Sequence, residues 1–561
     1  MLNNLHGVDI DPQAVEVTKL SLSLKVLEGE SQETIGAQLG LFKERALPDL
    51  GSNIKCGNSL IGPDYYEGRQ LTMSFINDEE RYRVNAFNWQ TAFPQVFIAG
   101  GFDVVIGNPP YIRIQAMQEW APTEVEFYKK KYIAASKGNY DIYVVFVEKG
   151  LSLLNMNGRL GFILPHKFFN AKYGDPLRGI ISCGKHLAKV VHFGDQQVFE
   201  NATTYTCLMF LDKSGHDEFE FEKVDDLKSW RDNGKSTARK IFADTATTAE
   251  WNFTVGSGSS LFDKLSKMPV KLGDIANIFV GLQTSADTVF LFKESKKSKS
   301  PTLVSQSKEL DKSVEIEAAI LKSVVRSGEI GRYWATPTAV VLFPYEILDG
   351  KFRLIPEGNF KTHFPKAWLY LLENKKLLSE REHGKFKDTG WYQLYPKNLD
   401  TWEQPKIMLP YMITRLSAYY DENNYYFVNV TTGGFGLTIK DGFGRHKYIT
   451  GLLNSKLLDW FMKIVSTSFH GGYFAANKQF LVQLPIRAIN FSNPSEKAAH
   501  DKMVSLVERM LELHRRLPAT RMPQEKEMIQ REIEATDAQI DRLVYELYGL
   551  TEEEIRVMEG R

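Results

Sequence analysis

The stretch FDVVIGNPPY, residues 102–111, decides the fold of the first part of the chain. Its apolar run, Phe102–Gly107, is typical of a buried strand, and turn-forming residues follow at once. In α/β enzymes, ligands bind at the carboxyl ends of the strands. We therefore expect the Asn108–Tyr111 loop to form part of a site at such a strand end.

Each residue of the Asn108–Tyr111 loop can contribute to binding a planar amino group. The two prolines fix φ and remove two backbone donors, so the loop presents bare carbonyl oxygens. The Asn108 side-chain oxygen and the Pro109 carbonyl can both accept from one exocyclic amino group, and Tyr111 offers a flat face for stacking. The pattern favours an amino group on an aromatic base. The alternative is a proline-stiffened turn without a ligand.

The composition of the 561 residues is that of a globular protein with more than one domain, with 43% hydrophobic and 25% charged residues. The formal net charge is +0, so any nucleic-acid surface must be a local patch. Three cysteines without paired spacing argue against a disulfide framework or a metal cluster and favour a cytoplasmic location. No apolar stretch approaches the ~20 residues of a membrane span.

Strands and helices alternate on both sides of the loop. Leu5–Pro12 resembles a strand end, after which Asp11 can cap a helix over Ala14–Leu27. Asn53–Leu60 is typical of a short strand that ends in a turn. Farther along we expect a helix over 140–154 and strands over 158–165, 190–193 and 206–211. This alternation predicts an α/β domain with a largely parallel sheet.

Two polar residues at these strand ends could bind a cofactor. The Asp9 carboxylate could accept both hydroxyls of a ribose, although a capping or surface carboxylate is the simpler interpretation of this residue alone. The side-chain carbonyl of Asn58 could accept from an adenine amino group, and a simple turn is equally compatible with its sequence.

In this order, the motifs resemble those of the gamma class of N6-adenine DNA methyltransferases, especially the type IIG restriction–modification family. The resemblance extends over nearly the whole chain. It implies S-adenosylmethionine as cofactor, double-stranded DNA as partner and no membrane association. It also implies catalytic residues Asn108, Pro109, Pro110 and Tyr111, base-stacking residues Tyr111 and Phe199, and cofactor-binding residues Asp9, Ile10, Asn58, Pro110 and Phe146.

The implied reaction has a physical rationale. Adenine N6 is buried in the duplex, so the base must be flipped out, which costs roughly a few kcal/mol. Stacking on Tyr111 and Phe199 would recover roughly 1–3 kcal/mol per base. Acceptors at Asn108 and Pro109 would localise the N6 lone pair and aim it at the methyl group for in-line transfer, without a metal.

One departure from the family concerns its glycine-rich cofactor loop, which lies one strand before the ribose-binding motif. Only six residues precede Gly7, and Gly256–Ser259 lies far downstream, where it is typical of a linker or helix cap. We therefore expect an amino-terminally truncated domain that binds cofactor poorly alone. A missing amino-terminal segment or a partner subunit would carry the loop and the nuclease, since no convincing nuclease motif is present.

Four regions are expected. They are a partial Rossmann-like methyltransferase domain over 1–212, a connecting region over 213–255 with Asp217–Lys223 as a charged edge strand, a mixed α+β target-recognition domain over 256–490, and a C-terminal helical hairpin over 491–561. A basic, glycine-rich surface suits contact with phosphates and bases. The candidate DNA contacts are Arg326, Arg332, Lys406, Gly471, Gly472 and Lys478.

The leading hypothesis is a site-specific adenine-N6 DNA methyltransferase of a restriction–modification or related phage-defence system. One alternative is a non-catalytic DNA-binding remnant or specificity subunit, which the lack of a glycine-rich loop favours. A second alternative is a protein glutamine N-methyltransferase, because an amide nitrogen is also planar. The long second domain argues against that alternative.

Overall fold

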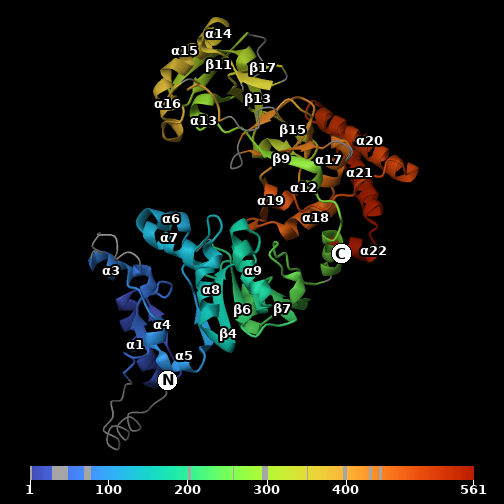
Figure 1. The fold of residues 1–561 in the computed structure, drawn as a ribbon. Coiled ribbons are helices and arrows are strands. Elements are labelled where there is room, and N and C mark those ends of the chain that lie inside the picture. The colour runs from blue at the N-terminus through green and yellow to red at the C-terminus, as the bar shows by residue number, and fades with distance from the viewer. Residues whose placement is uncertain are drawn as a thin grey trace, which may run out of the picture. The chain divides into compact units, whose positions relative to one another are not determined.

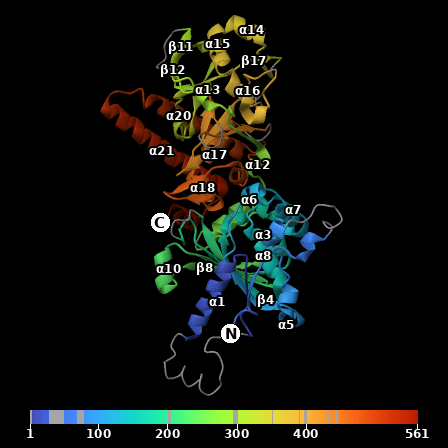
Figure 2. The ribbon, with the colours of Figure 1, turned by 90° about the vertical axis from the view of Figure 1, so that its left-hand side faces the viewer.

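The computed structural model describes residues 3–27, 49–67, 78–199, 204–256, 258–293, 301–349, 351–388, 390–395, 401–428, 433–440 and 445–560. The chain divides into two compact units, Met1–Gly256 and Ser257–Arg561 (Figure 1 and Figure 2). Of the helices within these described ranges, none is long and apolar enough to cross a membrane.

The first unit begins with a parallel pair of short strands. Strand β1 (Gly7–Asp9) pairs with β2 (Ile54–Cys56), and helix α1 (Pro12–Leu27) lies between them in sequence. The predicted cap of this helix is confirmed, because the Asp11 carboxylate accepts a hydrogen bond of 2.8 Å from the backbone N–H of Gln13.

Helix α1 buries a different face from the one its spacing suggests. Val15 packs against Leu50 and Ile54, whereas the apolar series further along the helix stays more than half exposed. Its described members are Val17, Leu20 and Leu24. Exposed apolar side chains in such a row are typical of a surface that another element covers.

A six-stranded sheet in the order β3-β4-β6-β5-β7-β8 forms the centre of the first unit. Strand β6 runs antiparallel to both its neighbours, so the sheet is mixed and the prediction of a largely parallel one is wrong. A parallel return needs a crossover helix, and the described residues between β5 and β6 contain none. The strands are β3 (Phe102–Gly107), β4 (Leu154–Pro165), β5 (Leu187–His192), β6 (Thr206–Asp212), β7 (Glu218–Lys223) and β8 (Thr237–Phe242).

The expected charged edge strand lies inside the sheet instead. Strand β7 is hydrogen-bonded to β5 on one side and to β8 on the other, so the region expected to connect the domains completes the first sheet. The reason is its alternation, in which Phe219 and Phe221 are buried in the core. The glutamates that alternate with these phenylalanines, Glu220 and Glu222, both form ion pairs with Lys189 of β5.

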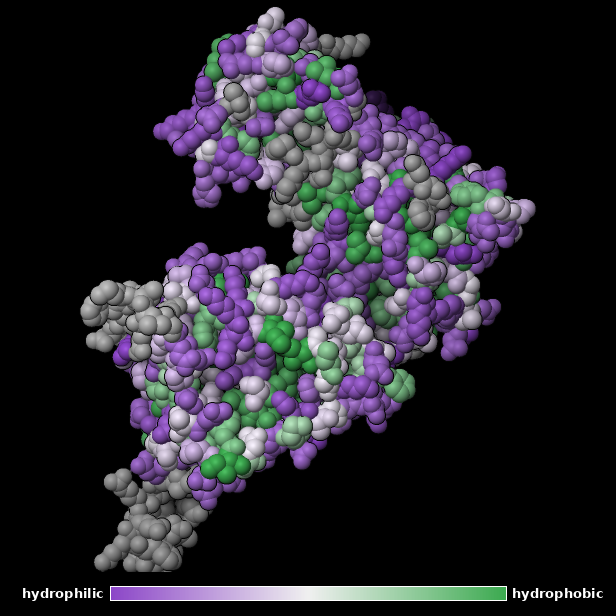
Figure 3. All heavy atoms as spheres, in the orientation of Figure 1, coloured by the Kyte–Doolittle hydropathy of each residue, from purple (hydrophilic) through white to green (hydrophobic). Residues whose placement is uncertain are grey.

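Helices do not cover the two faces of the sheet equally. Helices α8 (Tyr143–Leu153) and α9 (Asp175–Cys183) bury one face. On the other face lies a hollow of about 960 Å³, and apolar surface is visible on the first unit near β4 and β6 in Figure 3. Val104 and Ile106 of β3 are 59% and 79% exposed there, so the prediction that β3 is buried is wrong. Among the described residues, β3 pairs only with β4 and forms the edge of the sheet.

The remaining helices of the first unit surround these strands. Tyr143 and Phe168 lie at the centre of its buried cluster, beside the sheet residues Leu160 and Met209. The other helices are α3 (Asp78–Val84), α4 (Trp89–Ala92), α5 (Pro94–Ile98), α6 (Ile114–Trp120), α7 (Pro122–Lys131) and α10 (Leu227–Asn233).

The second unit contains two four-stranded sheets and several hairpins. The first sheet has the order β21 (Tyr419–Asp421), β19 (Lys406–Pro410), β23 (Gly434–Ile439) and β9 (Ala276–Val280). The second has the order β10 (Leu291–Lys293), β16 (Ala339–Leu342), β13 (Leu321–Val325) and β22 (Tyr426–Phe427). The short pairs are β11 (Thr302–Ser307) with β12 (Lys312–Glu317), β14 (Ile330–Gly331) with β15 (Trp334–Ala335), and β17 (Tyr345–Leu348) with β18 (Lys351–Leu354).

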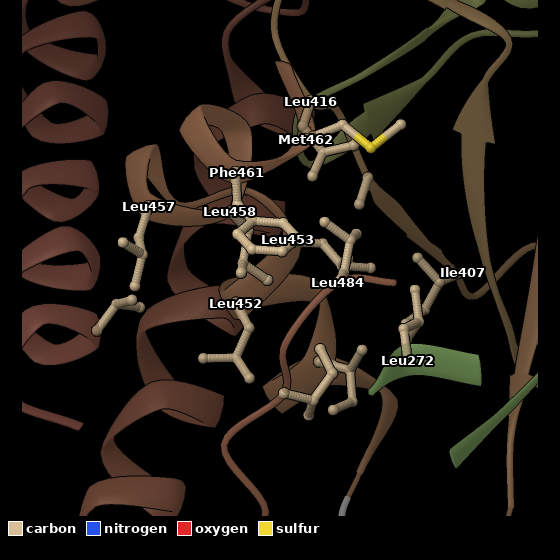
Figure 4. Close-up of a cluster of buried hydrophobic side chains, with 14 of the residues drawn as sticks. Leu272, Ile407, Leu416, Leu452, Leu453, Leu457, Leu458, Phe461, Met462 and Leu484 are labelled. Atoms are coloured by element: carbon tan, nitrogen blue, oxygen red, sulfur yellow. The ribbon is translucent and has the colours of Figure 1, made fainter. Parts of the chain in front are cut away.

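Helices α17 (His446–Leu453) and α18 (Lys456–Val465) carry much of the core of the second unit. Their leucines meet Ile407 of β19 and Leu484 (Figure 4). Smaller helices complete this unit. They are α11 (Ser259–Ser266), α12 (Leu272–Ile275), α13 (Asp287–Phe290), α14 (Glu357–His363), α15 (Pro365–Glu373), α16 (Lys375–Gly384) and α19 (Lys478–Leu481).

The C-terminal segment is helical. Helices α20 (Pro494–Arg516) and α21 (Pro523–Tyr548) pack against each other and bury their apolar faces in the core formed by α17 and α18. The last helix, α22 (Glu552–Glu559), has the predicted capping box, because Thr551 and Glu554 each accept from the other's backbone N–H.

Candidate active site

Three strands of the first sheet, β3, β4 and β5, have their carboxyl ends on the same side of the sheet. Strands β3 and β4 are parallel, and β4 and β5 both run opposite to β6, so β3, β4 and β5 point the same way. The Asn108–Tyr111 loop follows β3 directly, as predicted. Its neighbours on this side are the residues that follow Pro165 of β4 and His192 of β5.

The Asn108–Tyr111 loop is held by the tyrosine hydroxyl. It donates to the Asn108 side-chain oxygen at 2.8 Å and lies 3.1 Å from the Ile163 carbonyl oxygen, a second acceptor. Burial raises the pKa of Tyr111 to about 12, so this hydroxyl stays protonated at neutral pH. Its ring meets that of Tyr143 edge-on, at 6.4 Å between centroids.

Asn108 is exposed, whereas Pro109 is buried. The Asn108 oxygen that we expected to accept from a substrate is therefore oriented by Tyr111 in this structure, with one lone pair still open.

The expected cofactor residues at β1 and β2 come together. Parallel pairing sets Asp9 opposite Cys56, two residues before Asn58. Asp9 is exposed, and one of its carboxylate oxygens accepts from the Asp11 backbone N–H at 2.9 Å. The Asn58 side-chain oxygen accepts from the Leu60 backbone N–H at 3.1 Å. An open carboxylate oxygen at the end of a strand fits a ribose with two hydroxyls.

Phe146 and Tyr111 pack against one buried cluster that also contains Leu60 and Ile61. The residues after Asn58, the helix α8 and the Asn108–Tyr111 loop are thus joined by one core. Ile10 is 52% exposed beside Asp9, as a residue that covers a ligand would be before binding. Pro110 is exposed as well.

Phe199 stands apart from this group. It is partly buried on the segment that follows β5, and in the part of the chain that the structure describes its ring makes no stacking contact with Tyr111. Its role in base stacking stays a prediction.

Two of the candidate DNA contacts are wrong. Lys406 is fully buried, and its ammonium group donates to the Trp402 carbonyl at 2.7 Å and pairs with Asp421 at 2.6 Å. The Arg332 side chain is 18% exposed and is bound by Asp537 and the Asn454 carbonyl. Both cations hold the interior of the second unit together, which their sequence context did not indicate.

The exposed turn between β24 (Ser468–Phe469) and β25 (Tyr473–Ala475) stays a candidate for DNA contact. Gly471 and Gly472 have φ of +82° and +74°, which favours glycine, and leave the backbone open to a close approach. Nearby, Lys478 is exposed, although its ammonium group donates to the Ile278 carbonyl at 3.2 Å. Arg326 is partly buried at the end of β13.

Sequence reasoning missed a pair of histidines at the edge of the first sheet. His166 directly follows β4 and His192 ends β5, and their ring centroids lie 4.1 Å apart. The available signal was their place at the ends of two predicted strands, where α/β enzymes bind ligands.

Two family models match the chain. Residues 3–199 match the Eco57I restriction-modification methylase, which includes β1, β2 and the Asn108–Tyr111 loop, and residues 358–486 match the TaqI-like C-terminal specificity domain. The chain therefore contains an Eco57I-like restriction–modification methylase domain and a TaqI-like specificity domain. It is homologous to type II restriction–modification methyltransferases.

Relatives of this chain include the type II restriction enzyme and methyltransferase RM.Eco57I of Escherichia coli. The two are 30% identical over 97% of this chain and 54% of the relative, so the chain spans about half the length of that relative. The type II methyltransferase M.BstVI of Geobacillus stearothermophilus is 22% identical over 82% of this chain and 75% of the relative. The solved structure of the type IIL enzyme MmeI with DNA shares the fold, with a TM-score of 0.54 and 14% identity over 83% of this chain and 57% of that one.

Proposed function

We propose that this chain transfers a methyl group from S-adenosylmethionine to N6 of a flipped-out adenine in DNA, as part of a type IIG restriction–modification or related phage-defence system. The observation that carries the proposal is the Asn108–Tyr111 loop at the end of β3, with an exposed amide whose oxygen is oriented by a tyrosine. The specificity domain supports DNA as the partner.

In this proposal the loop prepares the amino nitrogen. The Asn108 oxygen and the Pro109 carbonyl accept the two N6 hydrogens, which draws them out of the ring plane and localises the nitrogen lone pair. Tyr111 stacks on the base from the loop after β3, and Phe199 stacks on it from the segment 193–199 that follows β5. S-adenosylmethionine, when bound, supplies an electrophilic methyl group.

Binding of the methyl donor is assigned to residues at the ends of β1 and β2. The open oxygen of Asp9 accepts the ribose hydroxyls, while Ile10 and Phe146 cover the adenine ring. Asn58 accepts from the adenine amino group with its remaining lone pair, since its first is used by Leu60.

Tritiated methyl transfer to DNA, followed by sequencing of the modified bases, tests the reaction. Methyl label in adenine N6 is the expected result. Label in protein glutamine but never in DNA would contradict it. DNA binding without any methyl transfer, even with the methyl-donor site complete, would favour a non-catalytic specificity subunit.

Tyr111→Phe should lower the methyl transfer rate about tenfold, because the variant keeps the stacking ring but loses the hydrogen bond that orients Asn108. Tyr111→Ala removes the ring as well and should cost a further factor of about ten or more. Initial rates at saturating DNA measure both. A phenylalanine variant as fast as the original protein would contradict an orienting role for the hydroxyl.

We further propose that a polypeptide segment outside the described residues completes the methyl-donor site with a glycine-rich loop, supplied by the same chain or by a partner subunit. The support is apolar surface that is exposed to solvent. In the part of the chain that the structure describes, strand β3 has one unpaired edge with Val104 and Ile106 exposed beside it, and α1 exposes Val17, Leu20 and Leu24. Such surfaces are typical of interaction sites.

Calorimetry tests this completion of the site. The chain alone should bind S-adenosylmethionine at least about tenfold more weakly than the same chain with a polypeptide that carries the loop, because the loop would add contacts to the methyl donor. Ile106→Lys should abolish the gain by placing a charge on the exposed face. Full affinity of the chain alone would contradict the proposal.

A further inference from the structure

Two histidines hold Gly194, the second residue after β5. The backbone N–H of Gly194 donates to Nδ1 of His192 at 3.1 Å, and its carbonyl oxygen lies 3.2 Å from Nε2 of His166. Gly194 has φ of +60°, a conformation that favours glycine. Both polar groups of one residue are therefore bound by imidazoles from two different strand ends.

These hydrogen bonds define whether Nδ1 of His192 and Nε2 of His166 carry a proton. Nδ1 of His192 must be an unprotonated acceptor, because the Gly194 N–H points at it. Nε2 of His166 must carry a proton, because it faces a carbonyl oxygen. His192 is therefore neutral, whereas the bond of His166 requires only a proton on Nε2, which the neutral ring can also carry.

The surroundings favour the neutral state. Burial lowers the pKa of His166, and burial together with His166 and Lys223 lowers the pKa of His192 well below its usual range. The other titratable or charged groups around the pair come from β6, β7 and the following segment. They are the buried thiol of Cys207, the carboxylate of Glu222, which is bound by Lys189 and Trp230, and Asp195.

Gly194 lies in a segment, 193–199, that is anchored further along the chain. The Gln196 side chain donates to the Val224 carbonyl at 2.6 Å and accepts from the Leu227 N–H at 2.5 Å. Arg231 donates to the Val198 carbonyl at 3.0 Å. Phe199, the residue expected to stack on the flipped base, ends this segment, so its position depends on these anchors.

We propose that His166 and His192 are positioning residues that fix the segment 193–199 in their neutral form and release it when they are protonated. The proposal rests on the proposed function, in which Phe199 stacks on the base. The histidine pair thereby makes base stacking dependent on pH.

The direction follows from the geometry. A proton on Nδ1 of His192 removes the acceptor of the Gly194 N–H, and two adjacent imidazolium rings repel each other. The released segment therefore binds protons more readily than the held one. The held state is complete above the ordinary histidine pKa of 6.5 and weakens as the pH falls below it.

Hydrogen–deuterium exchange of the full chain tests the release of the segment 193–199 without any need for methyl transfer. After correction for intrinsic rates, peptides over 193–199 should lose protection as the pH falls below the histidine pKa. His192→Asn retains an acceptor near the place of Nδ1 and does not titrate, so it should stay protected across the range. His192→Leu should exchange about tenfold faster at every pH, through loss of one hydrogen bond.

Methyl transfer gives a second readout. His192→Leu should lower the rate about tenfold at neutral pH, whereas His192→Asn should restore it and lose the acidic fall in rate. His166→Gln, which retains a donor near Nε2, and His166→Leu form the matched pair on the other side. Protection in His192→Leu equal to that of the original protein, or an unchanged acidic loss of protection in His192→Asn, would overturn the proposal. Absent methyl transfer by the original protein contradicts the proposed function and leaves the exchange result standing.

Discussion

Asn108→Ala should abolish measurable methyl transfer, with a loss of about 10²–10³-fold or more, the scale seen when one oriented polar group at a reaction centre is removed. The Asn108 oxygen is exposed at the end of β3 and is oriented by the Tyr111 hydroxyl, so alanine removes an acceptor that no neighbouring side chain replaces in position. Initial rates of tritiated methyl transfer at saturating DNA and cofactor measure the effect.

The change should leave the fold and DNA binding intact, because Asn108 contributes no buried contact. Thermal unfolding and DNA affinity of Asn108→Ala should therefore match those of the original protein. Asn233→Ala, an exposed residue at the end of α10 in the same unit, is the matched control and should transfer methyl groups normally. An Asn108→Ala protein that keeps more than about a tenth of the activity would contradict the assignment of Asn108 as an acceptor for the reacting nitrogen.

Lys406→Met should destabilise the second unit by about 3–5 kcal/mol, because it leaves the Asp421 carboxylate buried without its cation. The two side chains are both 0% exposed, and Asp421 also accepts from the Asn423 and Tyr425 backbone N–H groups. These two N–H groups keep the carboxylate in its buried position after the cation is lost. Chemical denaturation, followed by a signal specific to the second unit, measures the change.

Lys497→Met provides the matched control. Lys497 pairs with Asp501 on the surface of α20, where both side chains are more than half exposed, and its loss should cost less than about 1 kcal/mol. The same experiment separates the two interpretations of Lys406. A phosphate contact would show as weaker DNA binding with a smaller salt dependence and unchanged stability, which is the result that would refute a structural role.

Local patterns predicted several individual elements and helix caps well. Strand β3 begins and ends where its apolar run does, Asp11 caps α1, and Thr551 with Glu554 forms the capping box of α22. These features depend on residues within a few positions of one another, so the sequence contains all the information that they need. Long helices such as α20 follow for the same reason, from apolar residues at helical spacing.

Predictions that depended on distant partners were less reliable. The edge position of β3, the interior position of β7 and the antiparallel course of β6 are properties of strand order, which the pattern of one strand does not encode. Lys406 and Arg332 resembled surface cations because their partners, Asp421 and Asp537, are distant in sequence. A charged residue is classed correctly only when its counter-ion is known.

By itself, the sequence predicted the chemistry that we propose for the Asn108–Tyr111 loop. Asn108–Tyr111 after an apolar strand predicts acceptors for a planar amino group, because two prolines and an amide have that capacity in any strand-end turn. Only the tertiary structure decided how the loop is held and what surrounds it. Tyr111 reaches the Ile163 carbonyl across 52 residues, and His166 reaches Gly194 across 28. Such bonds form only after the sheet has brought separate strand ends together. The residues next to Tyr111 and His166 in the sequence do not predict these bonds.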